Sequence, residues 1–367
     1  MARSKAKNVG LIGLGIIGSR IAGALRKRGL QVFVWNRTPK PEQNFVGSPA
    51  EVAELCDVVQ LFVADDEALL EITKQLAPAL TAHHIITAHC TVAPESMRAT
   101  AEIVQRRGAR FLEAPFTGSK VAAQNGQLVY YVAGDEAALK QVRPILESSS
   151  KEIVVISEKI GDASVMKVAT NMVTAATAQV AAEALALVRN AGIPAESFSR
   201  AMKSNATNST TIEMKVPMMM AGDFEPHFSV KHMLKDVRIG MRLAESFGVE
   251  LPVTKAAGEM LLEEVKNGRA DADYASVAQK YFPVSKPFAR PEPPVRSEPA
   301  KIGEEIKSRG AVPSDSPQVL PKTEPKIEDA RETNASAKKE EVAEGVNLSG
   351  GFRGWLNRFH SSSRREV

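Results

Sequence analysis

Lys167 and Asn171 are the two residues whose types and spacing point most directly to acid–base chemistry. In a helix, a spacing of four residues places both side chains on the same face. The residues next to Lys167 on both sides, 165–166 and 168–169, are apolar, and burying a lysine ammonium there would lower its pKa toward the range of a proton donor near neutral pH. The alternative is a lysine that only extends its ammonium into solvent.

A glycine-rich loop near the start of the chain predicts a phosphate-binding site. The pattern G-x-G-x-x-G is formed by Gly13, Leu14, Gly15, Ile16, Ile17 and Gly18. It follows a predicted strand and opens a predicted helix, which is the context of a dinucleotide-binding loop. Gly13 would permit the tight turn, Gly15 would let a pyrophosphate approach, and Gly18 would let helix and strand pack closely. A glycine turn without a ligand is the alternative interpretation.

Asn36, Arg37 and Thr38 follow the second predicted strand, where NAD-binding sites usually carry an acidic residue for the ribose 2′-hydroxyl. No carboxylate stands at this point, and a guanidinium can hold the 2′-phosphate of NADP. We therefore predict NADP as the cofactor, with NAD as the less favoured one. If Arg37 is only an exposed loop charge, this preference is lost.

The elements that must position these residues form two predicted domains. In residues 1–161 short apolar runs alternate with amphipathic stretches, which predicts an N-terminal Rossmann domain: a doubly wound, mostly parallel α/β sheet. Its strands are predicted at residues 9–12, 31–35, 58–63, 85–87, 110–113, 128–133 and 153–156. Residues 162–282 contain no convincing strand, so we predict an all-helical C-terminal domain. There, residues 163–191 lack glycine and proline and predict one long apolar helix, buried between domains or subunits.

Residues 283–367 have a different composition, dominated at first by Pro, Glu, Lys and Ser, and predict a disordered tail. Near its end Phe352, Trp355, Leu356 and Phe359 recur at three- and four-residue steps among arginines. This short basic amphipathic pattern would suit contact with a membrane surface or a protein. A marginal helix without a partner is the alternative.

Composition favours a protein without nucleic acid, metal or disulfides. The net charge is only +4, which gives no basis for a nucleic-acid-binding surface. The two cysteines, Cys56 and Cys90, have no metal-ligand spacing, and they predict a reducing compartment. We interpret His89 and Cys90 together as packing in the core or around the cofactor loop. No signal peptide or bilayer-spanning run is recognised, so we expect a soluble cytoplasmic protein.

Together these motifs resemble the β-hydroxyacid dehydrogenase family, which includes 3-hydroxyisobutyrate dehydrogenases, tartronate semialdehyde reductases and glyoxylate/succinic semialdehyde reductases. The resemblance extends over roughly residues 8–282. Its motifs, in chain order, are the glycine loop with residues 36–37, Glu-Ala-Pro-Phe-Thr-Gly-Ser-Lys at 113–120, residues 161–171, and Phe-Ser-Val-Lys-His-Met-Leu-Lys-Asp at 228–236. Phe116-Thr117 departs from the family's usual Val-Ser, and Gly118-Ser119-Lys120 looks most like the glyoxylate/succinic semialdehyde reductases.

The resemblance implies a catalytic and substrate-binding set. Lys167 would protonate the carbonyl oxygen of the substrate as a hydride arrives from the nicotinamide. Asn171 would orient the substrate by a hydrogen bond. Thr117, Gly118 and Ser119 would offer hydroxyl and backbone donors to the substrate carboxylate.

The resemblance also implies further cofactor contacts. Val63, Thr91 and Lys235 would lie at the nicotinamide end of the cofactor, and Asp236 would be a structural partner. The substrate would be a small carboxylate-bearing aldehyde or keto acid, interconverted with its hydroxy acid.

Two other hypotheses compete with this reductase. One is a catalytically silent NADP-binding scaffold that acts through its tail, and the other is a related reductase that acts on imines. Retention of both Lys167 and Asn171 argues against them, because imine-reducing relatives usually replace the lysine. The long apolar helix further predicts a homodimer or homotetramer.

Overall fold

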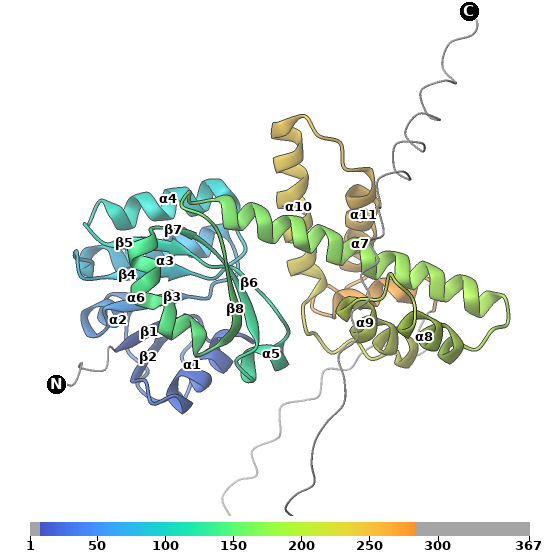
Figure 1. Cartoon of the computed structure of the whole chain (residues 1–367), viewed down its shortest axis with the longest axis horizontal. Coiled ribbons are helices and arrows are strands. Elements are labelled where there is room, and N and C mark those ends of the chain that lie inside the picture. Colours follow the sequence, from blue (N-terminus) through green and yellow to red (C-terminus); the bar gives the residue numbers. More distant parts are fainter. Residues whose placement is uncertain (1–7, 283–367) are drawn as a thin grey trace, which may run out of the picture. The chain divides into compact units, whose positions relative to one another are not determined.

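A mixed sheet organises the first part of the chain, and the computed structural model describes residues 8–282. The predicted tail, with its basic amphipathic segment, lies outside the described residues. The strands are β1 (Val9–Ile12), β2 (Val32–Trp35), β3 (Val58–Leu61), β4 (Ile85–Ala88), β5 (Arg110–Glu113), β6 (Phe116–Thr117), β7 (Leu128–Gly134) and β8 (Ser150–Ser157). They are ordered β2-β1-β3-β4-β5-β7-β6, and β8 also pairs with β7 (Figure 1).

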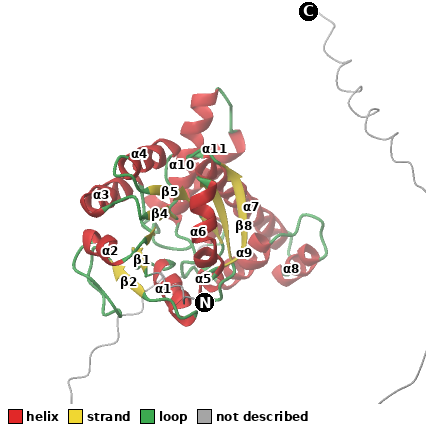
Figure 2. Ribbon diagram, turned by 60° about the vertical axis from the view of Figure 1, so that its left-hand side comes forward, coloured by secondary structure: helices red, strands yellow, loops and turns green. Residues whose placement is uncertain are grey.

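The sheet is wound on both faces, as the sequence predicts. One apolar core packs α1 (Gly18–Lys27), α5 (Lys120–Gln124) and α6 (Glu136–Glu147) against the sheet. A second core packs α2 (Pro49–Leu55), α3 (Asp66–Leu76) and α4 (Pro94–Gln105) against the sheet as well, and a short 3₁₀ helix, η1 (Ala77–Ala79), follows α3. Figure 2 shows these helices around the sheet. The strand order turns at β1 and β3, which is where such folds bind dinucleotides.

One part of the sheet departs from the parallel pattern. β1 to β5 are parallel to one another, whereas β7 runs antiparallel to β5 and β6 antiparallel to β7. The connection between β6 and β7 spans only residues 118–127, which is short for the crossover that a parallel neighbour requires. The two-residue strand β6 gives no periodic signal in the sequence, and so it was not predicted.

The second part is helical, as predicted, and residues 162–282 contain no strand. Its helices are α7 (Asp162–Asn190), α8 (Ala195–Lys203), α9 (Thr210–Ala221), α10 (Val230–Phe247), α11 (Pro252–Lys266) and the 3₁₀ helix η2 (Tyr274–Lys280). Asp273 is fully buried and accepts hydrogen bonds from Lys215 Nζ at 2.7 and 2.9 Å and from the backbone N–H groups of His227 and Phe228. This ion pair therefore fixes the loop that leads into α10.

The long helix α7 joins the two parts. It contacts β7, β8 and α4 as well as α9, α10, α11 and η2. Within residues 8–282 it alone is long and apolar enough by composition to cross a membrane, and a core helix of a helical domain passes the same test. Because sheet and helices belong to one compact unit, the predicted division at residues 161 and 162 stays a prediction.

The start of α1 provides a test of the packing. A Cβ on Gly18 would lie 1.9 Å from the carbonyl oxygen of Gly13, whereas a Cβ on Gly23 in the same helix meets no described atom within 4 Å. We expect Gly18→Ala to lower the free energy of unfolding by roughly 3 kcal/mol, because backbone must move. Gly23→Ala should raise it by about 0.5–1 kcal/mol. Urea denaturation measures both, and equal stability of the two variants would contradict this packing.

Candidate active site

The three glycines of the loop after β1 are each required for a different reason. Gly13 has φ +103°, and a Cβ there would lie 2.1 Å from the carbonyl oxygen of Phe62. Gly18 packs against the carbonyl oxygen of Gly13, which leaves no room for a Cβ. A Cβ on Gly15 meets no described atom within 4 Å, so this glycine borders open space. A loop that is tight at both ends and open in the middle fits the approach of a pyrophosphate.

The end of β2 is fastened to this loop. Asn36 Oδ1 accepts a hydrogen bond from the backbone N–H of Leu14 at 2.8 Å, and Asn36 Nδ2 donates to the carbonyl of Thr38 at 2.7 Å. Arg37 and Thr38 are exposed. Lys40 Nζ donates to the carbonyl of Leu14, which brings a second cation to the loop beside Arg37. Lys40 was not predicted as a cofactor residue, although its position three residues after Arg37 was a signal in the sequence.

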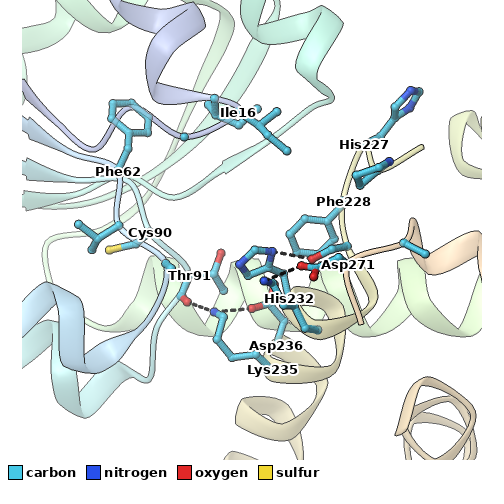
Figure 3. Close-up of a pocket in the computed structure, with 18 of the residues that line it drawn as sticks. Ile16, Phe62, Cys90, Thr91, His227, Phe228, His232, Lys235, Asp236 and Asp271 are labelled. Carbon is cyan, nitrogen blue, oxygen red and sulfur yellow. Dashed lines mark hydrogen bonds and ion pairs between the residues drawn. The ribbon is translucent and has the colours of Figure 1, made fainter. Parts of the chain in front are cut away.

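A cavity of about 980 Å³ opens beside the glycine loop. The loops after β3 and β4 border it, and α10 and the loop before it form its far wall (Figure 3). The predicted cofactor residues that line it are Gly15, Ile16, Ile17, Gly18, Val63, Thr91 and Lys235. The predicted cofactor residues outside its lining are Gly13, Leu14, Asn36, Arg37 and Thr38, which form the start of the glycine loop and the end of β2.

A chain of hydrogen bonds connects α7 to this cavity. Lys167 Nζ donates to Asn171 Oδ1 at 2.8 Å, and Asn171 Nδ2 donates to Asp236 Oδ2 at 2.6 Å. Lys235 Nζ donates to Asp236 Oδ1 at 2.8 Å and to the carbonyl of Thr91, as Figure 3 shows. Asp236 and Lys235 line the cavity, whereas Lys167 and Asn171 lie outside its lining.

The environment of Lys167 makes its ammonium a stronger acid than an ordinary lysine. The side chain is buried, and this burial lowers the pKa of Lys167 to about 8. The carboxylate of Asp236 raises this pKa and the charge of Lys235 lowers it further, but burial is the largest cause. The alternative of a lysine that reaches freely into solvent is therefore wrong. A lysine with this pKa can release a proton near neutral pH.

Glu113, at the end of β5, fixes the start of α7. Its carboxylate is fully buried and accepts hydrogen bonds from the backbone N–H groups of Ala163 at 2.5 Å and Ser164 at 3.3 Å, and from Ser164 Oγ at 3.1 Å. Burial raises the pKa of Glu113 to about 7, against these hydrogen bonds. Glu113 was predicted only as part of a motif, with no role of its own, because its hydrogen-bond partners lie 50 and 51 residues away in the sequence.

The predicted carboxylate-binding turn lies at one side of the site. Gly118 has φ +134°, and Ser119 Oγ accepts from the backbone N–H of Ala122 at 3.3 Å, which caps α5. Thr117, Gly118 and Ser119 lie outside the cavity lining, while the preceding Phe116 belongs to it. Lys120 forms an ion pair with Glu225, in the loop before α10. The turn is thus tied to the helical wall of the cavity.

Comparison with protein families now identifies the chain. The NAD-binding domain of 6-phosphogluconate dehydrogenase matches residues 8–157, and the NAD-binding domain of NADP-dependent 3-hydroxyisobutyrate dehydrogenase matches residues 161–281. The chain belongs to the β-hydroxyacid dehydrogenase family. This family indicates an NAD(P)-dependent oxidoreductase of the hydroxyacid dehydrogenase type.

The relatives that are similar in sequence include both a reductase and a nuclear factor. Glyoxylate/succinic semialdehyde reductase 2 of Arabidopsis thaliana is 29% identical over 282 residues, which is 74% of this chain and 78% of the relative. Cytokine-like nuclear factor N-PAC of Homo sapiens is 28% identical over 288 residues, 75% of this chain and 52% of N-PAC. The chain therefore spans about half the length of that relative.

Solved structures support the fold. A 3-hydroxyisobutyrate dehydrogenase of Mycobacterium tuberculosis has a TM-score of 0.68 and 23% identity, covering 75% of this chain and 99% of the other. Psf3, solved in complex with NADP⁺ and 2-OPP, has a TM-score of 0.69 and 20% identity, covering 74% and 99%. At 20–23% sequence identity, the similarity to these structures supports the fold alone.

Proposed function

We propose that this protein is an NADP(H)-dependent reductase of a small carboxylate-bearing aldehyde or keto acid, of the glyoxylate or succinic semialdehyde type. The observation that carries the proposal is the buried chain Lys167–Asn171–Asp236, which ends in the cavity beside the glycine loop. A buried lysine with a lowered pKa, connected by hydrogen bonds to a cavity, is typical of a catalytic acid or base. The silent scaffold is therefore the less favoured reading of the site.

The residues around the cavity fit a dinucleotide. Gly15 borders open space, and no side chain caps the start of α1 at Ile17, so a pyrophosphate can approach the positive end of this helix. When bound, the cofactor supplies the hydride that the carbonyl carbon accepts. Thr91, Lys235 and Val63 would surround its nicotinamide end.

Lys167 would complete the reaction by giving a proton from Nζ to the carbonyl oxygen, which becomes the hydroxyl of the product. The proposal includes a rotation of the Lys167 side chain toward the cavity when substrate is bound. This rotation would break the hydrogen bond between Lys167 Nζ and Asn171 Oδ1. The amide of Asn171 could then orient the substrate by a hydrogen bond. Water would return the proton to Lys167 after product leaves.

The proposed substrate class is supported by the turn at residues 117–119 and by the plant relative's name. Thr117, Gly118 and Ser119 would bind the substrate carboxylate by hydroxyl and backbone donors. Phe116, which lines the cavity, would form an apolar wall beside the carbon chain. A short acid with an aldehyde or keto group suits such a site.

The preference for NADP is supported by two cations at the glycine loop. Arg37 is exposed at the end of β2, and Lys40 lies against Leu14. Two cations and no carboxylate at this point favour a 2′-phosphate over a bare ribose.

The function is tested by turnover and its pH dependence. Wild-type protein should oxidise NADPH with glyoxylate, succinic semialdehyde, tartronate semialdehyde or methylmalonate semialdehyde, followed by nicotinamide absorbance. Because the protonated Lys167 is the acid, kcat/KM for reduction should fall as pH rises through about 8, and the reverse oxidation should rise through about 8. Lys167→Met should lower kcat by about 10²- to 10⁴-fold with NADPH binding retained.

The matched control is the exposed Lys203, whose replacement by Met should leave turnover unchanged. Tight NADPH binding without turnover on any of the four aldehydes and keto acids would favour the binding scaffold instead.

The cofactor preference is tested by Arg37→Asp. Loss of a charge-assisted contact and repulsion of the 2′-phosphate should weaken NADP⁺ binding about 10- to 100-fold, with little effect on NAD⁺. Isothermal titration calorimetry measures both, and Arg107→Asp, at an exposed position in the loop after α4, is the control. An equal loss of affinity for NADP⁺ and NAD⁺ would rule out Arg37 as the 2′-phosphate ligand.

We further propose a homodimer, or a homotetramer built from it, through α7. Val173, Val180 and Leu187 are 67%, 57% and 75% exposed, and their seven-residue spacing places them along one side of the helix. Val180→Asp combined with Leu187→Asp should shift the mass measured by light scattering toward the monomer. Val155→Asp, at an exposed position of β8, should not. A monomeric wild type at micromolar concentration would contradict the proposal.

A further inference from the structure

His89 directly follows β4, and only one of its two ring nitrogens, Nδ1, has a hydrogen-bond partner among the described residues. The side chain is 2% exposed and stacks on Phe62, with ring centroids 4.5 Å apart and an angle of 10° between the planes. Its Nδ1 lies 2.9 Å from the carbonyl oxygen of Ala114. A carbonyl oxygen only accepts hydrogen bonds, so the proton is on Nδ1 and Nε2 is left as an acceptor.

That acceptor has no hydrogen-bond partner among residues 8–282. Protonation cannot satisfy it near neutral pH, because burial lowers the pKa of His89 to about 3. Buried polar atoms in proteins are nearly always satisfied by some donor. His89 also belongs to the lining of the cavity beside the glycine loop, but Nε2 itself is covered, so a donor in the cavity reaches it when the side chains over it shift.

The order of the strands indicates which part of the proposed cofactor reaches His89. The glycine loop follows β1, and Arg37 follows its neighbour β2, which assigns the adenosine half to that side. The nicotinamide half must then extend the other way, over the ends of β3 and β4. His89 stands directly at the end of β4. The nicotinamide ring carries no donor of its own, whereas its carboxamide carries an –NH₂ group.

We propose that His89 Nε2 accepts a hydrogen bond from the carboxamide –NH₂ of the nicotinamide and so selects the intact nicotinamide group. This inference rests on the proposed NADP(H) site. It gives a binding role to a residue that the sequence analysis interpreted as packing. The fixed tautomer makes the contact specific, because Nε2 accepts an amide proton and repels a second acceptor.

The test compares two oxidised cofactors that differ only at this group. NADP⁺ carries the amide, and its 3-acetylpyridine analogue replaces the –NH₂ by a methyl group. In wild-type protein the analogue should bind about tenfold more weakly by calorimetry, because Nε2 loses its donor. In His89→Leu the two should bind within about twofold of each other, and in His89→Gln, which keeps an acceptor, the preference should return.

A fragment without nicotinamide separates this inference from the proposed function. 2′-Phospho-ADP-ribose should bind wild type and His89→Leu equally, since it never reaches β4. If wild type does not bind this fragment, the proposed cofactor site itself is overturned. If wild type binds it but shows no preference for NADP⁺ over the analogue, or if His89→Leu keeps the preference, the role of His89 is overturned.

A measurement on wild-type protein alone removes any dependence on the folding of the variants. In protein labelled with ¹⁵N-histidine, the Nε2 resonance of His89 should shift upfield on addition of NADP⁺, as expected for an acceptor that gains a hydrogen bond. The acetylpyridine analogue should leave it in place. The same shift with both compounds would assign the donor to another group, such as a ribose hydroxyl, and overturn the inference.

Discussion

The buried carboxylate of Asp236 is the interaction on which the site depends. It is 1% exposed and accepts hydrogen bonds from Asn171 and from Lys235, and its charge acts on the nearby Lys167. Two ammonium groups so close together in a buried region would repel each other, and a carboxylate between them offsets that repulsion. Because Asp236 belongs to α10 and Asn171 to α7, the same carboxylate also sets how these two helices pack at the cavity.

A second buried carboxylate determines where α7 begins. Glu113 receives the first N–H groups of α7 at the end of β5, so the helix that carries Lys167 is attached to the sheet that carries the glycine loop. Lys235 adds a third attachment, from α10 to the backbone at Thr91. Proton donor, cofactor loop and cavity wall are thus held by polar contacts between elements that are far apart in sequence. Precise placement of reacting groups requires such cross-links.

Much of the fold follows from local patterns. The strands of the sheet are short apolar runs ended by turn residues, and β5 is predicted with the bounds observed, Arg110–Glu113. The less regular strand β8 extends over Ser150–Ser157, beyond the predicted 153–156, because its outer residues are partly exposed and carry no apolar signal. The antiparallel β7 was not predicted as such, because strand direction depends on which partner a strand meets, and the sequence of a strand does not encode that partner.

The sequence by itself determined the glycine loop, the alternation of strands and helices, and the pairing of Lys167 with Asn171, because each depends on sterics or spacing within a few residues. Only the tertiary structure identified the hydrogen-bond partners of Glu113, Asp236, Lys40 and His89. Their contacts join residues separated by 50, 65, 26 and 25 positions respectively. Burial decided the pKa values of Lys167 and His89: removal of water by packing is the largest cause that lowers each of them.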